Sequence, residues 1–498
     1  MTFRLPPWLL PLALLGLATA CGGDRSPGPR HVLLITLDTT RADHLGPYGE
    51  TRFETPALDA LASQGVVFER CCAAAATTLS SHASLMTGTY PLRHGVVRNG
   101  FSVDGSNRML AEALAAAGFQ CAAFVASSAL ISATGMDQGF QVYDERLDLP
   151  ASPGGNDQAQ RVAGSVTTAI LDHLDRAASS VDGERLFLFA HYFDPHAPYG
   201  APGSRDAAGF EDIEAAVSAQ QQRLLGAAPG QQGVISSGLP AALAGPVDTA
   251  PSPRDQRLAA LYGEEVQYLD GEIGRLLAGL AARGLLEETL VVVTADHGET
   301  FWEQGNFWNH GLWVGESDVR VPLIVRGPGA EAGVRVATPV SGVDVAPTIL
   351  EAVGLSPGAV DDPGRGRSLS SALRGEPLEL RAVFSEATQP GPLLEQAPDL
   401  AWAGGAKPQA VRLGDWKLIK APYLGVRRLF DLGSDPAERR DLLAEPSLGP
   451  AARAALEDLE RAHAVWRAAA SPRPSSFDPA QAEALRGLGY GGFEDEDD

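Results

Sequence analysis

Four short apolar runs constrain the fold of this chain more than any other feature of its sequence. They occupy residues 32–37, 186–190, 290–294 and 323–325. Runs of this length with so few polar residues are typical of strands buried on both faces of a parallel sheet. Helical patterns with one apolar face lie between them, for example at 110–117 and 269–280. The alternation predicts an α/β fold with a mixed, mostly parallel sheet flanked by helices.

Acidic and imidazole side chains directly follow two of these runs. Asp38 comes after the first, and Asp296 and His297 come after the third. Ligands bind at the carboxyl ends of the strands in open α/β sheets, so we expect these side chains to meet at one sheet edge. Taken alone, Asp38 would be better explained as the N-cap of a helix that follows the strand. Together the three predict a site for one divalent ion, because carboxylates and imidazole suit Ca²⁺, Mg²⁺, Mn²⁺ or Zn²⁺.

The chain of 498 residues is long enough for two to three folding units. Proline, glycine and glutamine are dense at 200–256, and proline and glycine thicken again at 354–366. We predict a signal peptide at 1–20, a tether at 21–30, a catalytic domain at 31–360 with an insertion or lid at 200–256, a small C-terminal α+β subdomain at 378–470, and an acidic tail at 471–498.

The N-terminus has the pattern of an export signal. Arg4 precedes a short apolar stretch that ends in small residues before Cys21. The segment 17–21 resembles a bacterial lipobox, which implies a lipid anchor at Cys21 and a cell-envelope lipoprotein in the periplasm or outer membrane. Plain secretion and an uncleaved anchor are the alternatives. The other cysteines, Cys71, Cys72 and Cys121, are odd in number and predict no disulfide framework.

The charge balance limits the partners of the chain. The formal net charge of -23 argues against nucleic acid, which needs a basic footprint. Lysine occurs only at positions 407, 417 and 420. An anionic substrate therefore needs a local positive charge to bind it, and a bound metal ion is the candidate for that charge. The sequence carries no signal for an oligomeric state.

Several motifs, in a fixed order, resemble those of the sulfatase family within the alkaline-phosphatase superfamily. They are LDTTRADHLG at 37–46, SSHASLMTGTYPLRHG at 80–95, TADHGE at 294–299, RVPL at 320–323, GDWKLI at 414–419 and LFDLGSDP at 429–436. The resemblance spans residues 31–445 and implies the sulfatase fold, an anionic ester as substrate and one metal ion, Ca²⁺ before Mn²⁺, Mg²⁺ or Zn²⁺.

The resemblance places Thr78 at the nucleophile position, where typical sulfatases carry a cysteine or serine that becomes formylglycine. That modification also needs proline two places on and arginine four places on, but this chain has Ser80 and His82 there. We therefore expect no formylglycine, and we expect the Thr78 hydroxyl to serve as nucleophile and as a further metal ligand.

Histidines stand where the family has other active-site groups. The resemblance implies catalytic roles for His196 and for His310, which can act as a general acid. His82 and Arg93 are candidates to support the nucleophile loop. A structural role for His191 is equally open. The family's two anion-binding lysines would fall near 126–128 and 310–311, where this chain has none, and Thr39 replaces a frequent second aspartate.

Three functions follow as hypotheses. The first is a metal-dependent sulfuric ester hydrolase. The second is a phosphoester or phosphonate hydrolase, or a phosphoethanolamine-type transferase, because a threonine ester is more readily formed and cleaved in phosphoryl transfer than with sulfate. The third is a non-catalytic binding lipoprotein, which would have no need of the whole set of site residues.

Overall fold

The computed structural model describes residues 28–147, 160–177, 183–197, 199–200, 250–303, 310–311, 313–358, 362–388, 407–422 and 425–469. The predicted signal peptide, Cys21 and the tail lie outside the described residues, as does most of the insertion predicted at 200–256.

A sheet of eight strands forms the centre of the molecule, in the order β10-β2-β9-β7-β1-β6-β4-β5. The strands are β1 (His31–Leu37), β2 (Val66–Phe68), β4 (Phe119–Phe124), β5 (Val142–Asp144), β6 (Arg185–Tyr192), β7 (Thr289–Ala295), β9 (Leu323–Arg326) and β10 (Val334–Val336). β1 pairs parallel with both β6 and β7, whereas β9 runs antiparallel to β7 and β2. The predicted mixed, mostly parallel sheet is confirmed.

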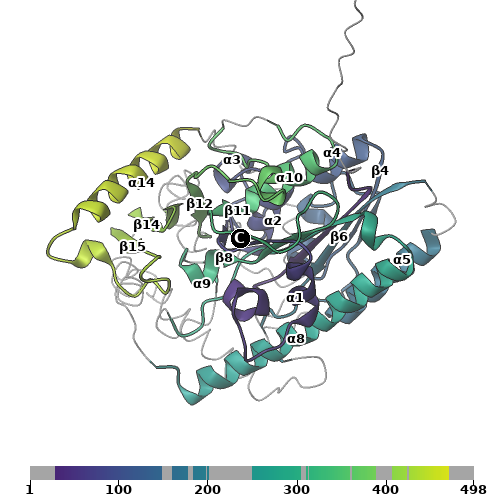
Figure 1. Ribbon diagram of the computed structural model, residues 1–498, viewed down its shortest axis with the longest axis horizontal. Coiled ribbons are helices and arrows are strands. Elements are labelled where there is room, and N and C mark those ends of the chain that lie inside the picture. Colours follow the sequence, from purple (N-terminus) through teal and green to yellow (C-terminus); the bar gives the residue numbers. More distant parts are fainter. Residues whose placement is uncertain are drawn as a thin grey trace, which may run out of the picture.

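Helices cover both faces of this sheet (Figure 1). One group comprises α1 (Pro56–Ser63), α5 (Ala163–Ala177) and α8 (Pro253–Ala282), and the other comprises α2 (Thr78–Thr87), α4 (Leu110–Ala116) and α10 (Val345–Ala352). This cover explains the sequence of β1, which is buried along its whole length. A strand with helices on both faces must be apolar on both, so it shows a continuous run in place of an alternating pattern.

Helix α8 begins earlier than the sequence prediction allowed. Ser252 caps its first turn, with Oγ accepting from the Asp255 N–H (3.2 Å) while the Asp255 carboxylate accepts from the Ser252 N–H (2.8 Å). This capping box starts the helix at Pro253. The insertion predicted to reach residue 256 therefore ends before the helix, and its proline-rich end serves as the helix start.

The C-terminal subdomain is a four-stranded antiparallel sheet covered by one helix, at the left of Figure 1. Its strands are β12 (Val383–Glu386), β13 (Gln409–Leu413), β14 (Trp416–Ala421) and β15 (Val426–Asp431), and its helix is α14 (Pro450–Ala469). Trp466 of α14 stacks on Phe384 of β12 with ring centroids 4.6 Å apart. Strand-like patterns at 382–384, 417–419 and 429–430 and a helical pattern at 450–470 predict three of these strands and the helix, but no such pattern marks β13.

Short strands join the two sheets. β3 (Cys71–Cys72) lies between β8 (Arg320–Val321) and β11 (Val340–Ser341).

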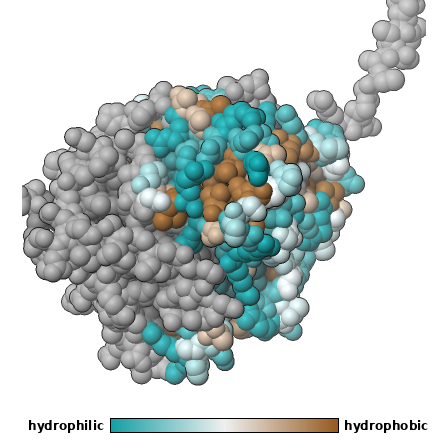
Figure 2. All heavy atoms as spheres, turned by 90° about the vertical axis from the view of Figure 1, so that its left-hand side faces the viewer, coloured by the Kyte–Doolittle hydropathy of each residue, from teal (hydrophilic) through white to brown (hydrophobic). Residues whose placement is uncertain are grey.

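Beside the C-terminal sheet is a cavity of about 540 Å³, lined by apolar and arginine side chains that include Tyr90, Phe384, Arg381 and Val465. Figure 2 shows an apolar patch framed by hydrophilic side chains on this left-hand face of the molecule. Among the described helices, none combines the length and apolar character needed to cross a bilayer.

Candidate active site

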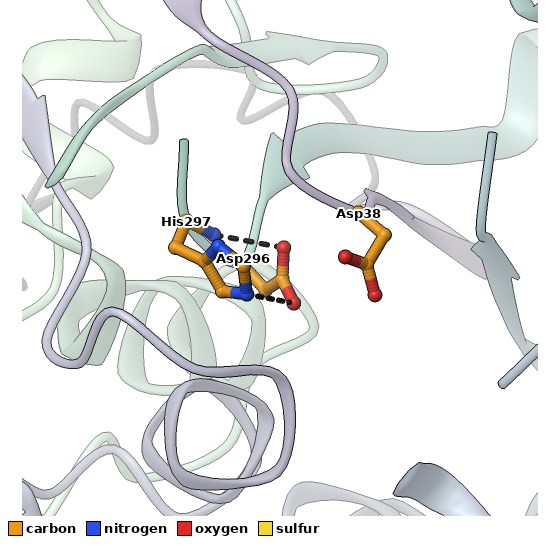
Figure 3. Close-up of side chains that lie close together, drawn as sticks. All are labelled: Asp38, Asp296 and His297. Carbon is orange, nitrogen blue, oxygen red and sulfur yellow. Dashed lines mark hydrogen bonds and ion pairs between the residues drawn. The ribbon is translucent and has the colours of Figure 1, made fainter. Parts of the chain in front are cut away.

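The ends of two neighbouring strands bring the predicted metal ligands together. β1 and β7 pair in parallel with Leu37 opposite Ala295, so the next residues, Asp38 and Asp296, emerge side by side. One ligand atom from each of Asp38, Asp296 and His297 lies within 4.8 Å of the others, and all three side chains are fully buried. Figure 3 shows the Asp38 carboxylate turned toward the Asp296–His297 pair. The expected meeting at one sheet edge is therefore observed.

Main-chain groups hold one oxygen of Asp296 in place. Its Oδ1 accepts from the N–H of Thr39 (3.2 Å) and from the N–H of His297 (2.8 Å). Thr39 reaches this position with a left-handed backbone, φ 49°, which is uncommon for a β-branched residue. The Tyr262 hydroxyl, which donates to the Thr39 carbonyl (2.9 Å), supports that turn.

The remaining carboxylate oxygens face the interior of the cluster. Oδ1 of Asp38 and Oδ2 of Asp296 are buried and accept no hydrogen bond. Buried acceptors without a partner are costly, so they mark a place where another group belongs. Burial raises the pKa of Asp38 to about 7, although His297 and a hydrogen bond from Thr78 favour its ionised form. Burial and the neighbouring Asp38 also raise the pKa of Asp296.

Thr78 lies at the first position of helix α2, beside this cluster. Its Oγ1 is 3.5 Å from Nε2 of His297. The next amide, that of Leu79, donates to Oδ1 of Asn99 at 2.8 Å. The start of a helix carries a partial positive charge and N–H groups that attract anions. The structure therefore brings Thr78 to the predicted metal ligands, and it adds Asn99, which the sequence analysis did not identify.

His82 lies one helical turn after Thr78, with both ring nitrogens engaged inside the protein. Nδ1 donates to the Thr78 carbonyl (2.7 Å), and Nε2 lies 2.9 Å from Oγ1 of Thr36. Burial lowers the pKa of His82 to about 3. Its Nδ1 is also 3.6 Å from Oδ2 of Asp296. These contacts tie helix α2 to β1.

His310 and His196 lie on the other side of the cluster. The His310 ring is 4.4 Å from that of His297 and 5.3 Å from that of His196. Nδ1 of His310 faces the Glu299 carboxylate at 3.3 Å, and Tyr199 also hydrogen-bonds to Glu299. Burial lowers the pKa values of His310 and His196, to about 4 and about 3, and raises that of Glu299 to about 7.

Glu299 belongs to the TADHGE motif, but the sequence analysis gave it no role. Its closeness to the third apolar run was the signal that could have identified it.

Two weaker candidates, His191 and Arg93, lie in different places relative to the cluster. His191 contacts Asp38, with Nε2 3.2 Å from Oδ2. Arg93 instead forms an ion pair with Asp362, which does not belong to the cluster.

The chain is similar to known proteins over most of its length. The family model described as Sulfatase matches residues 30–355. The choline-sulfatase of Rhizobium meliloti (strain 1021) is 27% identical over 486 residues, which cover 88% of this chain and 87% of that protein. A structure of BT4656 in complex with D-glucosamine-2-N,6-O-disulfate matches with a TM-score of 0.65 at 20% identity, covering 90% of this chain and 100% of that one.

Phosphorus chemistry is also represented among the similar structures. The phosphonate monoester hydrolase SpPMH from Silicibacter pomeroyi matches with a TM-score of 0.63 at 25% identity, covering 89% of this chain and 96% of that one. Because the family model covers well over half of the chain, this protein is a hydrolase of the sulfatase family.

Proposed function

We propose that this protein hydrolyses sulfate esters with the Thr78 hydroxyl as nucleophile and a divalent metal ion as cofactor. The observation that carries the proposal is the convergence of Thr78 on Asp38, Asp296 and His297 at the ends of two adjacent strands. A hydroxyl beside a metal cluster, at the start of a helix, is suited to attack on an anionic ester.

The residues of the cluster fit a metal ion. Two buried carboxylate oxygens, Asp38 Oδ1 and Asp296 Oδ2, have no hydrogen-bond partner, and His297 contributes a ring nitrogen close to both. Asp38, Asp296, His297 and Thr78 would hold the ion, and Ca²⁺ is the first choice because oxygen donors predominate. The ion would polarise the ester and lower the pKa of the bound hydroxyl.

Different steps of the reaction are then carried by different side chains of the protein. The Thr78 hydroxyl gives its proton to solvent as its oxygen attacks sulfur, and the bond from sulfur to the leaving oxygen breaks. His310, whose ring lies against His297 and Glu299, is placed to protonate that oxygen. An anionic ester beside the ring would raise the low pKa of His310 toward the working range. Water then attacks the sulfur of the threonine ester, which releases sulfate and regenerates Thr78.

The start of α2 supplies part of the positive potential that lysines give elsewhere in the family. The chain has no lysine before Lys407. Partial charge at the helix start and the oriented N–H groups favour an anion close to Thr78. His196, stacked on Phe193 with ring centroids 4.3 Å apart, borders the same space and would contact the ester.

Phosphorus esters are the second candidate, and the identity of residue 78 favours them. A formylglycine hydrate expels sulfate by collapsing to an aldehyde, whereas a threonine ester must be cleaved by a second attack. That second step is more accessible for phosphothreonine than for a sulfated threonine. The likeness to a phosphonate monoester hydrolase at 25% identity supports the same alternative.

A parallel assay separates the two candidates. Purified protein loaded with Ca²⁺, Mn²⁺ or Zn²⁺ is tested on 4-nitrophenyl sulfate, 4-nitrophenyl phosphate, bis(4-nitrophenyl) phosphate and a phosphonate monoester. Turnover of sulfate esters is expected, and turnover of phosphorus esters alone would replace the first candidate by the second. The mass of a peptide spanning residues 70–90 should match unmodified threonine, and an aldehyde there would contradict the nucleophile assignment.

We also propose that the protein is exported and held at a membrane by lipid on Cys21. The apolar N-terminal stretch that ends in a lipobox-like segment supports this location. The Cys21→Ser variant should move from the membrane fraction to the soluble fraction of an expressing bacterium. Equal membrane retention of the variant and the wild type would exclude the lipid anchor.

A further inference from the structure

Strand β12 lies at the edge of the C-terminal sheet, and its end also binds the segment that leads to Thr78. The Ser385 hydroxyl donates to the Ala73 carbonyl (2.6 Å), and the Glu386 N–H donates to the Ala74 carbonyl (3.0 Å). The N–H of Ala76 returns a bond to the Glu386 carbonyl (3.1 Å). Only Thr77 separates Ala76 from the nucleophile, so this short parallel pairing fixes the chain just before the reactive hydroxyl.

The same stretch of chain also reaches the loop of the proposed general acid. The Thr388 N–H donates to the carbonyl of Gly311 at 2.5 Å, directly after His310. Gly311 has a φ of +93°, and a Cβ there would lie 3.0 Å from methyl groups of both Thr388 and Thr77. The nucleophile segment and the His310 loop therefore meet on one strand end.

A buried ion pair locks this strand end. Glu386 and Lys407 pair with side chains that are 0% and 2% exposed. Oε1 of Glu386 also accepts from the N–H of Leu92 (3.3 Å), in helix α3 (Pro91–His94), which follows α2. The carboxylate therefore contacts the chain after the nucleophile helix, while its backbone binds the chain before it. The Ala387 N–H also donates to the carbonyl of Pro408, the residue after Lys407 (2.9 Å).

We propose that the Glu386–Lys407 pair is a positioning device that sets Thr78 against His310, so that the C-terminal subdomain completes the active site without contacting the substrate. This inference rests on the proposed roles of Thr78 and His310. Misplacement of a reacting group by about 1 Å can cost about 10²-fold in rate. Three of the four proposed metal ligands, Asp38, Asp296 and His297, directly follow β1 and β7, so metal binding should depend on this pair less than kcat does.

The test compares Lys407→Met with Lys407→Arg in the full-length protein. The 4-nitrophenyl ester that the wild type turns over fastest is used to measure kcat and KM well below the Tm. We expect Lys407→Met to lower kcat by about 10- to 100-fold, with KM and metal affinity changed by less than about threefold. Lys407→Arg, which keeps the charge, should recover most of kcat. Hydrogen exchange should be faster at residues 74–78 in Lys407→Met alone.

A matched control separates the effect of Lys407→Met on kcat from its effect on protein stability. Leu429→Ala empties a buried site in β15, at the opposite edge of the same sheet, and should lower the Tm comparably while leaving kcat unchanged. If Lys407→Met does not fold, Glu386→Gln/Lys407→Met takes its place, because it leaves no unpaired buried charge.

Three outcomes are decisive. Wild-type kcat in folded Lys407→Met, or in the double variant, overturns the inference. An equal loss of kcat in Leu429→Ala does so as well. Full activity in Thr78→Ala instead refutes the proposed function, while the exchange measurement still reports whether the ion pair orders the segment.

Discussion

Nε2 of His191 lies 3.2 Å from Oδ2 of Asp38, and both side chains are fully buried. Nδ1 of the same ring accepts from the Ala126 N–H (3.2 Å), so the ring proton resides on Nε2 and is donated to Asp38. The imidazole thus fixes the orientation of one carboxylate of the cluster, as histidine and carboxylate partners commonly do around metal sites.

His191→Leu should therefore weaken metal binding without removing a ligand. Loss of such an outer partner costs about 10- to 100-fold in metal affinity. Calorimetric titration of the metal-free protein with Ca²⁺ and Mn²⁺ measures the change. His173→Leu is the control, since His173 packs on Phe124 from helix α5. Equal affinities in wild type and His191→Leu would contradict the orienting role.

Removing the metal should destabilise the protein, because two buried carboxylates then face each other without a counter-charge. A ligand at a concentration of about 100 Kd stabilises the folded state by about 2.7 kcal/mol. The Tm of the wild type should fall on treatment with a chelator and recover when the ion is restored. Asp296→Ala should show the same Tm with and without the ion.

Thr78→Ala should lower kcat by about 10³-fold or more, since removal of a nucleophile abolishes the covalent route. Thr78→Ser keeps the hydroxyl and should retain a measurable part of the rate. Metal content, measured by mass spectrometry, should change less than kcat in both variants, because Asp38, Asp296 and His297 remain. An alanine variant with full activity would remove Thr78 from the mechanism.

Glu299→Gln should reduce kcat by about 10- to 100-fold, because it takes the carboxylate away from Nδ1 of His310. The loss should be largest for substrates with poor leaving groups, which need protonation most. Comparing 4-nitrophenyl esters with alkyl esters tests this. Uniform loss across leaving groups would point to a structural role for Glu299.

Acid should destabilise the protein partly through Glu316. Burial disfavours its ionised form, but Lys417 (Nζ to Oε1 2.9 Å) and Arg412 (Nη1 to Oε2 3.0 Å) bring its pKa down from 4.5 to about 2. A lowered pKa of the folded state stabilises the protein fully above about pH 4.5, and this stability disappears as the pH falls toward 2.

Urea unfolding between pH 2.5 and 6 measures this contribution. Glu316→Gln should flatten the acid side of the stability profile, whereas Glu376→Gln, which alters an exposed pair with Arg374, should follow the wild type. Identical profiles for Glu316→Gln and the wild type would assign the acid sensitivity to other carboxylates.

The metal cluster was predictable because its residues directly follow continuous apolar runs. A strand buried on both faces is legible from local sequence, and in a parallel sheet its end indicates where the next residue lies. Asp38 and Asp296 were found in this way. Thr78 was located only through the family resemblance, since nothing local marks the start of α2 as reactive.

Long-range contacts were not predictable. Asn99 contacts the start of helix α2 through its side chain alone. Lys407 is buried against Glu386, although lysine side chains are mostly exposed in proteins. Strand β13 escaped notice because Gln409 and Arg412 interrupt its apolar pattern, yet both are buried by partners from other segments. Such pairings depend on tertiary structure, which local patterns do not encode.

Some strands of the central sheet and of the three-stranded sheet can pair only with strands that are synthesised much later. β2 lies between β9 and β10, and β3 between β8 and β11, so both early strands wait for partners that are made much later. Contacts between distant segments slow folding, and unpaired strand edges invite aggregation. A chain cut short before β8 would therefore leave β2 and β3 without these partners and expose their edges, and a nascent chain would carry the open edges until about two thirds of it had been made.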